Sequence, residues 1–368
     1  YYLPLMGHQT TVFEMLPKLG GMLRYGIPNY RLPKDRLDED IQAILETGVQ
    51  VEFGKRIGKE ITIQSLREEY DAVLITIGAS TDKKLGIEGE QAEGVISAVS
   101  FLRDVGKDNA PDLTGQEVAV IGGGNVSMDA VRTAKRLGAK KVSIVYRRRT
   151  ADMTALPAEI EGAVAEGIEV LTLKAPSRIE TDENGHVSGI YVTPQMISKI
   201  KGGRASVCPT GEEDFLIPCQ TLIVAIGQDI ESEHFAEAGV PVSRGKIMTE
   251  RYGGFDNIPG VFAGGDCASG PASVIKAIAA AKVVAANIDE YLGYHHTLTC
   301  EAVVPEPKEN MRDLMGRTEI GERPANIRKK DFEHVEELLT HEEAMQEACR
   351  CLRCDHFGCG AMVGGRDL

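Results

Sequence analysis

Short apolar runs alternate with glycine turns and amphipathic stretches along this chain. Residues 118–121 and 142–146 are apolar at nearly every position, and a helical pattern follows the first run. Such runs are typical of parallel strands that are buried on both faces. Residues 71–78 and 221–227 repeat the design, each ending in glycine, which indicates two units of one kind. The pattern predicts an α/β fold built on parallel sheets.

The remaining segments follow the same hydrophobic reading. We expect a helix end at 1–7, strands at 9–13 and 49–53, and an amphipathic helix at 34–48. We further expect helices at 95–105, 157–166, 271–291 and 333–349, a strand at 169–173, a hairpin at 178–193, a loop at 200–215 and an arm or linker at 305–330. Strands that alternate with helices in this way point to Rossmann-like units.

Composition narrows the class of protein. The 368 residues suggest two or three domains, and 42% hydrophobic with 26% charged residues is normal for a globular protein. The net charge of −14 argues against a nucleic-acid partner. No apolar run reaches membrane-spanning length and no signal peptide is visible, so we expect a cytoplasmic protein without a membrane span.

The run at 118–121 leads into a glycine loop that predicts a dinucleotide site. Gly122 permits a tight turn, and Gly124 lets the backbone approach a pyrophosphate. Asn125 and Val126 begin the following helix, whose free N–H groups favour negative charge. The glycine pattern alone is weak, but its strand and helix are the context that the motif requires.

The next strand ends in Tyr146 and then three arginines, among them Arg147 and Arg148. A site for NAD places an acidic residue here, on the ribose 2′-hydroxyl. Guanidinium groups suit a 2′-phosphate instead, so we expect NADP(H). The competing interpretation is an ordinary turn followed by a solvated basic cluster.

A second dinucleotide unit is indicated at the N-terminal side. Glu14 ends a strand, as a ribose-binding acid does, and its glycine loop should lie about 20 residues upstream. That position precedes residue 1, so we expect the first strand and phosphate loop upstream of this chain. A Gly-Gly-Asp turn at 264–266 before a helix predicts another anion site, although Asp266 could simply cap that helix.

Four cysteines crowd into eleven residues near the end of the chain: Cys349, Cys351, Cys354 and Cys359. Four thiolates suit a [4Fe–4S] cluster or zinc, and we favour the cluster, with no metal as a third possibility. Neither nucleotide unit contains a Cys-x-x-Cys pair, which disfavours a dithiol-exchange enzyme. Hydride transfer needs no strong acid or base, so no residue is assigned a catalytic role.

Five motifs in order carry a family resemblance: residues 20–28, 122–129, 146–149, 260–266 and 350–354. With them the chain resembles the small (beta) subunit of glutamate synthase and related flavoproteins with two dinucleotide-binding domains. The resemblance implies an FAD domain of residues 1–95 and 228–295, split by an inserted NADP(H) domain of residues 114–227. Residues 296–368 would form a C-terminal arm, a helix and the Cys-rich tail.

The resemblance also implies which residues bind FAD. Glu14 would bind its ribose, Gly21 and Leu23 would line the flavin, and Asp266 would hold the ribityl or pyrophosphate region. The remaining FAD positions are Gly78, Gly227, Gly265 and Ser273, the last at the start of a helix whose dipole would face the flavin. Two departures are visible: Thr154 stands where the family usually has proline, and Ala281 where glycine is common.

Three functions compete. The first is an electron-transfer module that moves hydride between NADPH and FAD and exchanges electrons with iron–sulfur or flavin centres of a partner subunit, in a hydrogenase, formate dehydrogenase or electron-bifurcating transhydrogenase. The second is a stand-alone glutamate synthase small subunit, and the third is a non-enzymatic scaffold. The extra cysteines favour the first, and the intact glycine loop with its arginines argues against the third.

Overall fold

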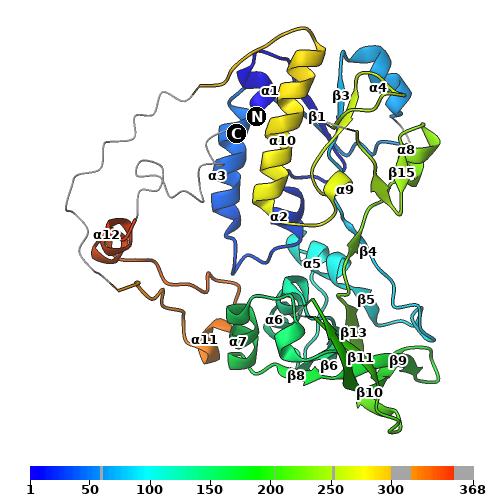
Figure 1. Cartoon of the computed structure of the whole chain (residues 1–368). Helices are drawn as coiled ribbons and strands as arrows, with labels where there is room; N and C mark the ends of the chain where they lie inside the picture. The colour runs from blue at the N-terminus through cyan, green and yellow to red at the C-terminus, as the bar shows by residue number, and fades with distance from the viewer. Residues whose placement is uncertain (59–60, 203, 251–252, 300–315, 352–368) are drawn as a thin grey trace.

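A computed structural model describes residues 1–58, 61–202, 204–250, 253–299 and 316–351. Its largest sheet is parallel, in the order β5-β13-β6-β7-β8 (Figure 1). These strands are β5 (Val95–Ser97), β6 (Glu117–Ile121), β7 (Lys141–Tyr146), β8 (Glu169–Thr172) and β13 (Thr221–Val224). We call residues 95–227 the five-stranded unit.

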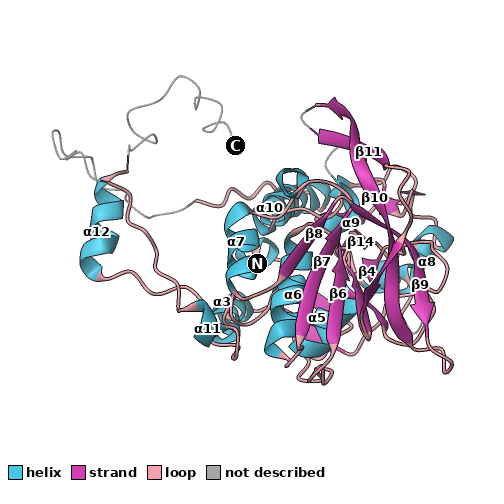
Figure 2. Cartoon of the chain, turned by 90° about the horizontal axis from the view of Figure 1, so that it is seen from below, coloured by secondary structure: helices cyan, strands magenta, loops and turns pink. Residues whose placement is uncertain are grey.

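Both faces of this sheet are covered, which explains its uninterrupted apolar runs. On β6, Val118 and Val120 face the core made with helices α5 (Ala98–Gly106), α6 (Asn125–Arg136) and α7 (Pro157–Ala165). Ala119 and Ile121 face the opposite way, into the core shared with an antiparallel sheet (Figure 2).

The antiparallel sheet has β10 (Val187–Lys201) at its centre. It pairs with β9 (Lys174–Thr181), which confirms the predicted hairpin, and with β11 (Arg204–Pro209) and β12 (Phe215–Pro218). The prediction of a loop at 200–215 is therefore wrong for its first part, which contains the end of β10 and all of β11. Gly202 has a φ of +57°, so the chain turns back there and continues the ladder as a second hairpin.

The remaining described residues of 1–94 and 228–299 form what we call the paired-strand unit. Here β1 (Thr11–Glu14) pairs in parallel with β2 (Gln50–Phe53), and β3 (Val73–Ile75) with β17 (Val261–Ala263). Two more pairs are β4 (Thr81–Asp82) with β14 (Gln228–Asp229), and β15 (Val242–Ser243) with β16 (Lys246–Ile247). Its helices are α1 (Tyr2–Leu5), α2 (Gly21–Tyr25), α3 (Lys34–Leu45), α4 (Ile63–Glu69), α8 (Glu233–Glu237), α9 (Asp266–Ser269) and α10 (Val274–Tyr291).

Three predicted helices have different limits. Residues 95–97 are strand β5, because they pair with β13 and Ser97 then caps α5. The helix expected from residue 271 begins at Val274. The helix expected from residue 333 is α12 (His341–Cys349), because Thr340 and Glu343 form a capping box that starts it there. Among the described helices none is long and apolar enough to cross a membrane.

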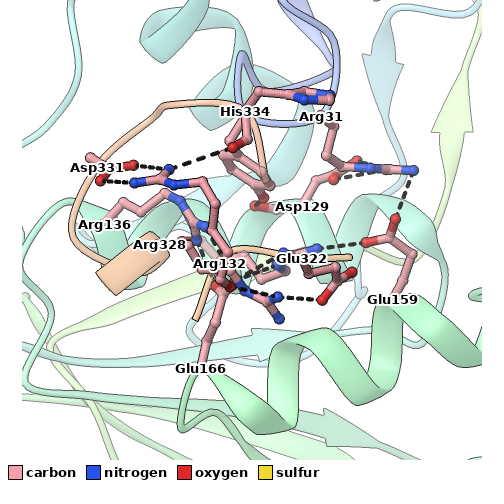
Figure 3. A network of polar contacts seen from close by, with 12 residues as sticks. Arg31, Asp129, Arg132, Arg136, Glu159, Glu166, Glu322, Arg328, Asp331 and His334 are labelled. Carbon is pink, nitrogen blue, oxygen red and sulfur yellow. Dashed lines mark hydrogen bonds and ion pairs between the residues drawn. The ribbon is translucent and has the colours of Figure 1, made fainter. Parts of the chain in front are cut away.

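Residues 316–337, which we call the arm, return to the body through α11 (Ala325–Arg328). Arg328 donates from Nε to the buried carboxylate of Glu166 at 3.0 Å. Arg132 and Arg136 of α6 bind the same carboxylate at 2.8 and 2.6 Å (Figure 3). One fully buried glutamate therefore joins two helices of the five-stranded unit to the arm.

The paired-strand unit reaches the same network through its loop at residues 29–31. Arg31 binds both oxygens of Asp129 on α6, at 2.9 and 3.0 Å (Figure 3). Tyr30, fully buried, lies under the guanidinium of Arg136 at 3.9 Å. The backbone of Val335 in the arm donates to the carbonyl of Tyr30 at 3.0 Å. The arm, the loop and α6 are thus held at one place.

Candidate functional site

The glycine loop between β6 and α6 is closely enclosed. A Cβ on Gly122 would lie 2.3 Å from the carbonyl oxygen of Ala225, and one on Gly123 would lie 2.6 Å from the ring of Tyr146. Gly122 also has a φ of +152°. Both positions therefore require glycine, and the backbone amides of the loop stay uncovered by side chains of its own residues.

Helix α6 begins at Asn125, and Gly124 precedes it as an extended N-cap. The side-chain oxygen of Asn125 accepts a hydrogen bond from the N–H of Leu156 at 3.0 Å, which fixes the start of α7 beside the loop. Thr154 donates its backbone N–H to Gly123 at 2.9 Å. Proline has no N–H to make that bond, so the threonine at this position adds a link that a Met-Pro sequence lacks.

The first turn of α6 therefore presents its N–H groups at the carboxyl edge of the sheet. Val126 is half-buried against the helix-side core, and Ser127 is fully buried with its hydroxyl 3.4 Å from the carbonyl of Ala225. A small residue is needed there, because α6 and β13 approach closely. Free N–H groups and the helix dipole make this end of α6 a place for an anion.

Arg147 and Arg148 follow β7, which pairs with β6 in parallel, so they lie at the same sheet edge as the glycine loop. Among the described residues neither guanidinium has a hydrogen bond or an ion pair, and Nε of Arg148 is buried without a partner. Arg149 differs, because it binds Asp152 through Nε at 2.8 Å and Nη2 at 3.0 Å. The hydrogen bonds from Arg149 lower the pKa of Asp152, and they use the guanidinium donors that Arg149 could otherwise offer to a ligand.

The residues predicted for the second nucleotide lie at strand ends of the paired-strand unit. Glu14 ends β1 and accepts a hydrogen bond from the N–H of Leu16 at 2.8 Å. Gly21 and Leu23 are in α2, and Gly21 has a φ of +48° with open space where a Cβ would stand. Gly78 follows β3 with a φ of +68° and is equally open.

Three more residues predicted to bind FAD, Gly265, Asp266 and Ser273, come much later in the sequence. Gly265 has a φ of +75° with nothing within 4 Å of a Cβ position, and Asp266 begins α9. Burial raises the pKa of Asp266. Ser273 is the N-cap of α10 and makes no side-chain cap bond, and Ile275 in the first turn is 74% exposed.

Gly227 lies where the chain leaves the five-stranded unit. Its neighbour Gln228 approaches Met22 of α2, with Nε2 4.0 Å from the sulfur. The structure thus brings the side chain of Gln228 to α2, which carries Gly21 and Leu23, whereas Gly227 itself lies beside Lys83. α2 also packs against α5, so this helix lies between the two units.

The cysteines of the two units and the described cysteines of the Cys-rich tail, residues 349–359, lie in different environments. Cys349 ends α12 and Cys351 follows it, whereas Cys354 and Cys359 lie outside the described residues. In the two units Cys219 and Cys267 are fully buried, and burial raises the pKa of both thiols, that of Cys219 to about 12. Such thiols are poor nucleophiles, in agreement with the argument against dithiol exchange.

Sequence reasoning missed the residues that support the glycine loop. Tyr146 packs its ring on Gly123 and donates its hydroxyl to the carbonyl of Asp152 at 2.8 Å. Asp152 also accepts from the N–H of Ala205 at 3.3 Å, which ties the arginine turn to β11. The spacing of Arg149 and Asp152 could have predicted their ion pair, because residues three apart can meet around a single turn.

Comparison with known proteins places these observations in a family. The family described as pyridine nucleotide-disulphide oxidoreductase matches residues 5–281. The NADP(+)-dependent formate dehydrogenase subunit beta of Moorella thermoacetica is 36% identical over 99% of this chain, which covers 54% of that subunit. The glutamate synthase [NADPH] small chain of Escherichia coli K12 is 32% identical over 78% of this chain and 64% of its own length.

This chain spans about half to two thirds of the length of those relatives. The resemblance to the glutamate synthase small subunit, inferred from the motifs, is confirmed. Among solved structures, Mycobacterium tuberculosis FprA in complex with NADPH superposes with a TM-score of 0.66 at 21% identity, covering 77% of this chain and 78% of FprA. That likeness confirms the α/β dinucleotide-binding fold.

Proposed function

This chain belongs to the pyridine nucleotide-disulphide oxidoreductase family, and from that premise we propose that it is an electron-transfer module that moves hydride between NADPH and FAD. The observation that carries the proposal is that Arg147 and Arg148 have no partner among the described residues, at the sheet edge that also carries the glycine loop, and that Nε of Arg148 is buried. A guanidinium nitrogen buried without a partner costs free energy unless a ligand supplies the acceptor.

The residues present fit NADP(H). Gly122 makes the tight turn and Gly124 would let the backbone approach the pyrophosphate. The N–H groups of Asn125 and Val126 would bind it, and the two arginines would hold the 2′-phosphate. Because Arg149 is held by Asp152, it keeps the turn in shape and does not compete for the phosphate. A dinucleotide without the 2′-phosphate leaves both arginines unpaired.

The paired-strand unit fits FAD by its open glycines. Gly21, Gly78 and Gly265 have positive φ and no neighbour within 4 Å of a Cβ position, so a flat ligand could lie directly on the backbone. Glu14 would accept from its ribose, and Asp266 and Ser273 would meet its linking chain. FAD supplies the conversion between two-electron and one-electron transfer.

We place the insertion that splits the FAD domain at residue 95 and not at 114. β5 pairs with β13, and Phe101 and Leu102 of α5 belong to the core of the five-stranded unit. The FAD domain then comprises residues 1–94 and 228–295, and residues 296–368 form the C-terminal part. The pairing of β4 with β14 supports this division, because it returns the chain to the first unit at residue 228.

We further infer that electrons pass between the flavin and an iron–sulfur partner of a larger complex. The match to a formate dehydrogenase beta subunit supports this, because it covers 99% of this chain, the cysteine segment included, and 54% of that subunit. Cys349, Cys351, Cys354 and Cys359 would ligate a [4Fe–4S] cluster, and zinc is the alternative. Metal analysis and low-temperature EPR of the reduced protein distinguish the two.

A stand-alone glutamate synthase small subunit is the second candidate. The match to the Escherichia coli small chain favours it, although that match covers 78% of this chain against 99% for the formate dehydrogenase subunit. The proteins that co-purify with this chain decide between them: a glutamine-dependent large subunit supports the second candidate, and a subunit rich in iron–sulfur centres supports the first.

The test of NADPH binding replaces Arg147 and Arg148 together by alanine. A charge-assisted hydrogen bond contributes about 1.5–3 kcal/mol, so the affinity for adenosine 2′,5′-bisphosphate should fall at least about tenfold, while NADH binding stays unchanged. Arg178→Ala is the matched control, because Arg178 is an arginine of the antiparallel sheet that stacks on Tyr191. Equal losses for both nucleotides would contradict the assignment.

A further inference from the structure

Two histidines and an aspartate converge at the C-terminal end of α10, away from the proposed nucleotide sites. Nε2 of His8 and Nδ1 of His296 each lie 2.7 Å from the same oxygen of Asp289. The ligand atoms of the three residues all lie within 4.8 Å of one another. Sixteen residues of helix separate Asp289 from Ser273, a rise of about 24 Å. This cluster therefore belongs to neither proposed cofactor site.

The three side chains are held in place by their surroundings. Asp289 is 2% exposed, and its second oxygen accepts the backbone N–H of His296 at 2.7 Å. Tyr294 stacks on the ring of His296 with centroids 5.4 Å apart and meets the ring of His8 edge-on at 5.5 Å. Both imidazoles are thus aimed at the same buried oxygen of Asp289, and the half-exposed ring of His296 forms the solvent-facing side of the cluster.

We propose that His8, Asp289 and His296 bind a divalent transition-metal ion of the zinc class, with solvent in the remaining position. Two imidazole nitrogens and one carboxylate oxygen are ligands that zinc accepts, at about 2.0–2.2 Å, in tetrahedral geometry. Such geometry needs each nitrogen about 3.3 Å from the oxygen, so the rings would move outward by about 0.6 Å. Magnesium and calcium prefer sites made of oxygen alone.

The ion would fasten two distant segments. His8 lies between α1 and β1, whereas Asp289 and His296 lie 281 and 288 residues further along. The apolar cluster beside them has only three buried members, Phe262, Val284 and Ile288. A bound ion would add to this small core and fix the approach to β1, and hence to Glu14, against α10.

The experiment titrates the full-length, chelator-treated protein with Co²⁺. Cobalt bound by nitrogen and oxygen gives weak visible bands, and cobalt bound by the tail cysteines would give stronger thiolate bands. The difference spectrum between wild type and His8→Ala therefore isolates the site proposed here. We expect one equivalent of cobalt at this site, with affinity reduced about 100-fold or more in His8→Ala and His296→Ala, since even an outer-shell change costs 10–100-fold. Zinc should displace the cobalt and raise the melting temperature of the wild-type protein.

Two further variants separate a metal site from a hydrogen-bonded cluster. His8→Gln can still donate to Asp289 but is a poor ligand, so it should keep the metal-free melting temperature and lose the cobalt bands. His186→Ala is the matched control, because His186 is an exposed histidine beside Glu93 and Asp182. Cobalt bands that persist in His8→Gln and His296→Ala, or that weaken equally in His186→Ala, would overturn the proposal.

Discussion

The glycine loop of the five-stranded unit and three glycines of the paired-strand unit, Gly21, Gly78 and Gly265, are built in opposite ways. Gly122 and Gly123 are enclosed, with a carbonyl and an aromatic ring less than 3 Å from their Cβ positions. Gly21, Gly78 and Gly265 have positive φ and nothing within 4 Å. Gly122 and Gly123 thus serve the packing of the protein on itself, whereas Gly21, Gly78 and Gly265 leave the backbone open toward whatever covers it.

The cores show the same contrast. Every residue of β13 is buried between two layers. In contrast, every residue of β1 and β2 is at least partly exposed, and Phe53 is 46% exposed. Strand β13 of the large sheet is therefore covered on both faces, whereas the pair of β1 and β2 presents apolar surface. Changes in the packed interior should act mainly on stability, and changes at the exposed nucleotide-binding positions of either unit mainly on ligand binding.

The largest effect is expected from Glu166→Ala. This substitution leaves three arginines around one buried position without their carboxylate, and breaking such a buried pair costs about 3–5 kcal/mol. The matched control is Glu169→Ala, since Glu169 pairs with Lys141 on the surface, where a pair is worth about 0–1 kcal/mol. Urea denaturation measures both, and equal losses would break the comparison.

Gly123→Ala tests the enclosed loop. The added methyl group must displace the ring of Tyr146, and overpacking costs about 1–3 kcal/mol. Gly78→Ala meets no neighbour, so its loss of stability should be limited to backbone strain of about 1–2 kcal/mol, while FAD retention falls. Thermal melts and the flavin content of the purified proteins measure the two effects. A Gly123→Ala protein with unchanged stability and an altered flavin content would reverse the assignment.

A smaller effect should depend on pH. Burial opposes ionisation of Glu166, but the hydrogen bonds from Arg136 and Arg132 outweigh it and lower its pKa from 4.5. A lowered carboxyl pKa stabilises the folded state above pH 4.5, and this stabilisation is lost as the pH falls through the folded value. The stability difference between wild type and Glu166→Gln should therefore shrink below pH 4.5. A difference that is constant from pH 6 to 3.5 would show that the carboxylate does not carry it.

The smallest change in stability is expected for Ile275→Ser in the first turn of α10. This side chain is 74% exposed, so the free energy of unfolding should change by no more than about 0.5 kcal/mol. Flavin retention should nevertheless fall, because the residue lies in the first turn of α10, two residues after Ser273 of the proposed FAD site. Equilibrium dialysis with FAD measures this effect. An unaltered FAD affinity would place the flavin elsewhere.

The sequence predicted most where local signals and buried strands agree. The glycine loop, β6, α6 and the hairpin of β9 and β10 follow from apolar runs and turn residues, because each needs only its own neighbours. The start of α12 could also have been predicted, because Thr340 and Glu343 have the spacing of a capping box. β11 was missed because its ladder with β10 depends on a turn at Gly202 that the polar residues around it conceal.

The Glu166 network could not be predicted. Arg132 and Arg136 are four residues apart on one helix, which indicates a shared face, but nothing near them in sequence identifies Arg328 as the third donor. Arg147 and Arg148, which have no partner in the part of the chain that the structure describes, were anticipated by type and position. The hydrogen bonding of Arg149 to Asp152 was not anticipated, because the sequence does not show which of the three arginines Asp152 contacts.

The bond from Arg328 to Glu166 spans 162 residues and has a consequence for the order in which the chain folds. Closing so long a loop costs conformational entropy before any contact repays it. Its acceptor exists only after α6 and α7 have met, because Arg132 and Arg136 must already compensate the buried charge. We therefore expect the arm to dock last in refolding and to detach first in unfolding, with hydrogen exchange in α11 faster than in β6.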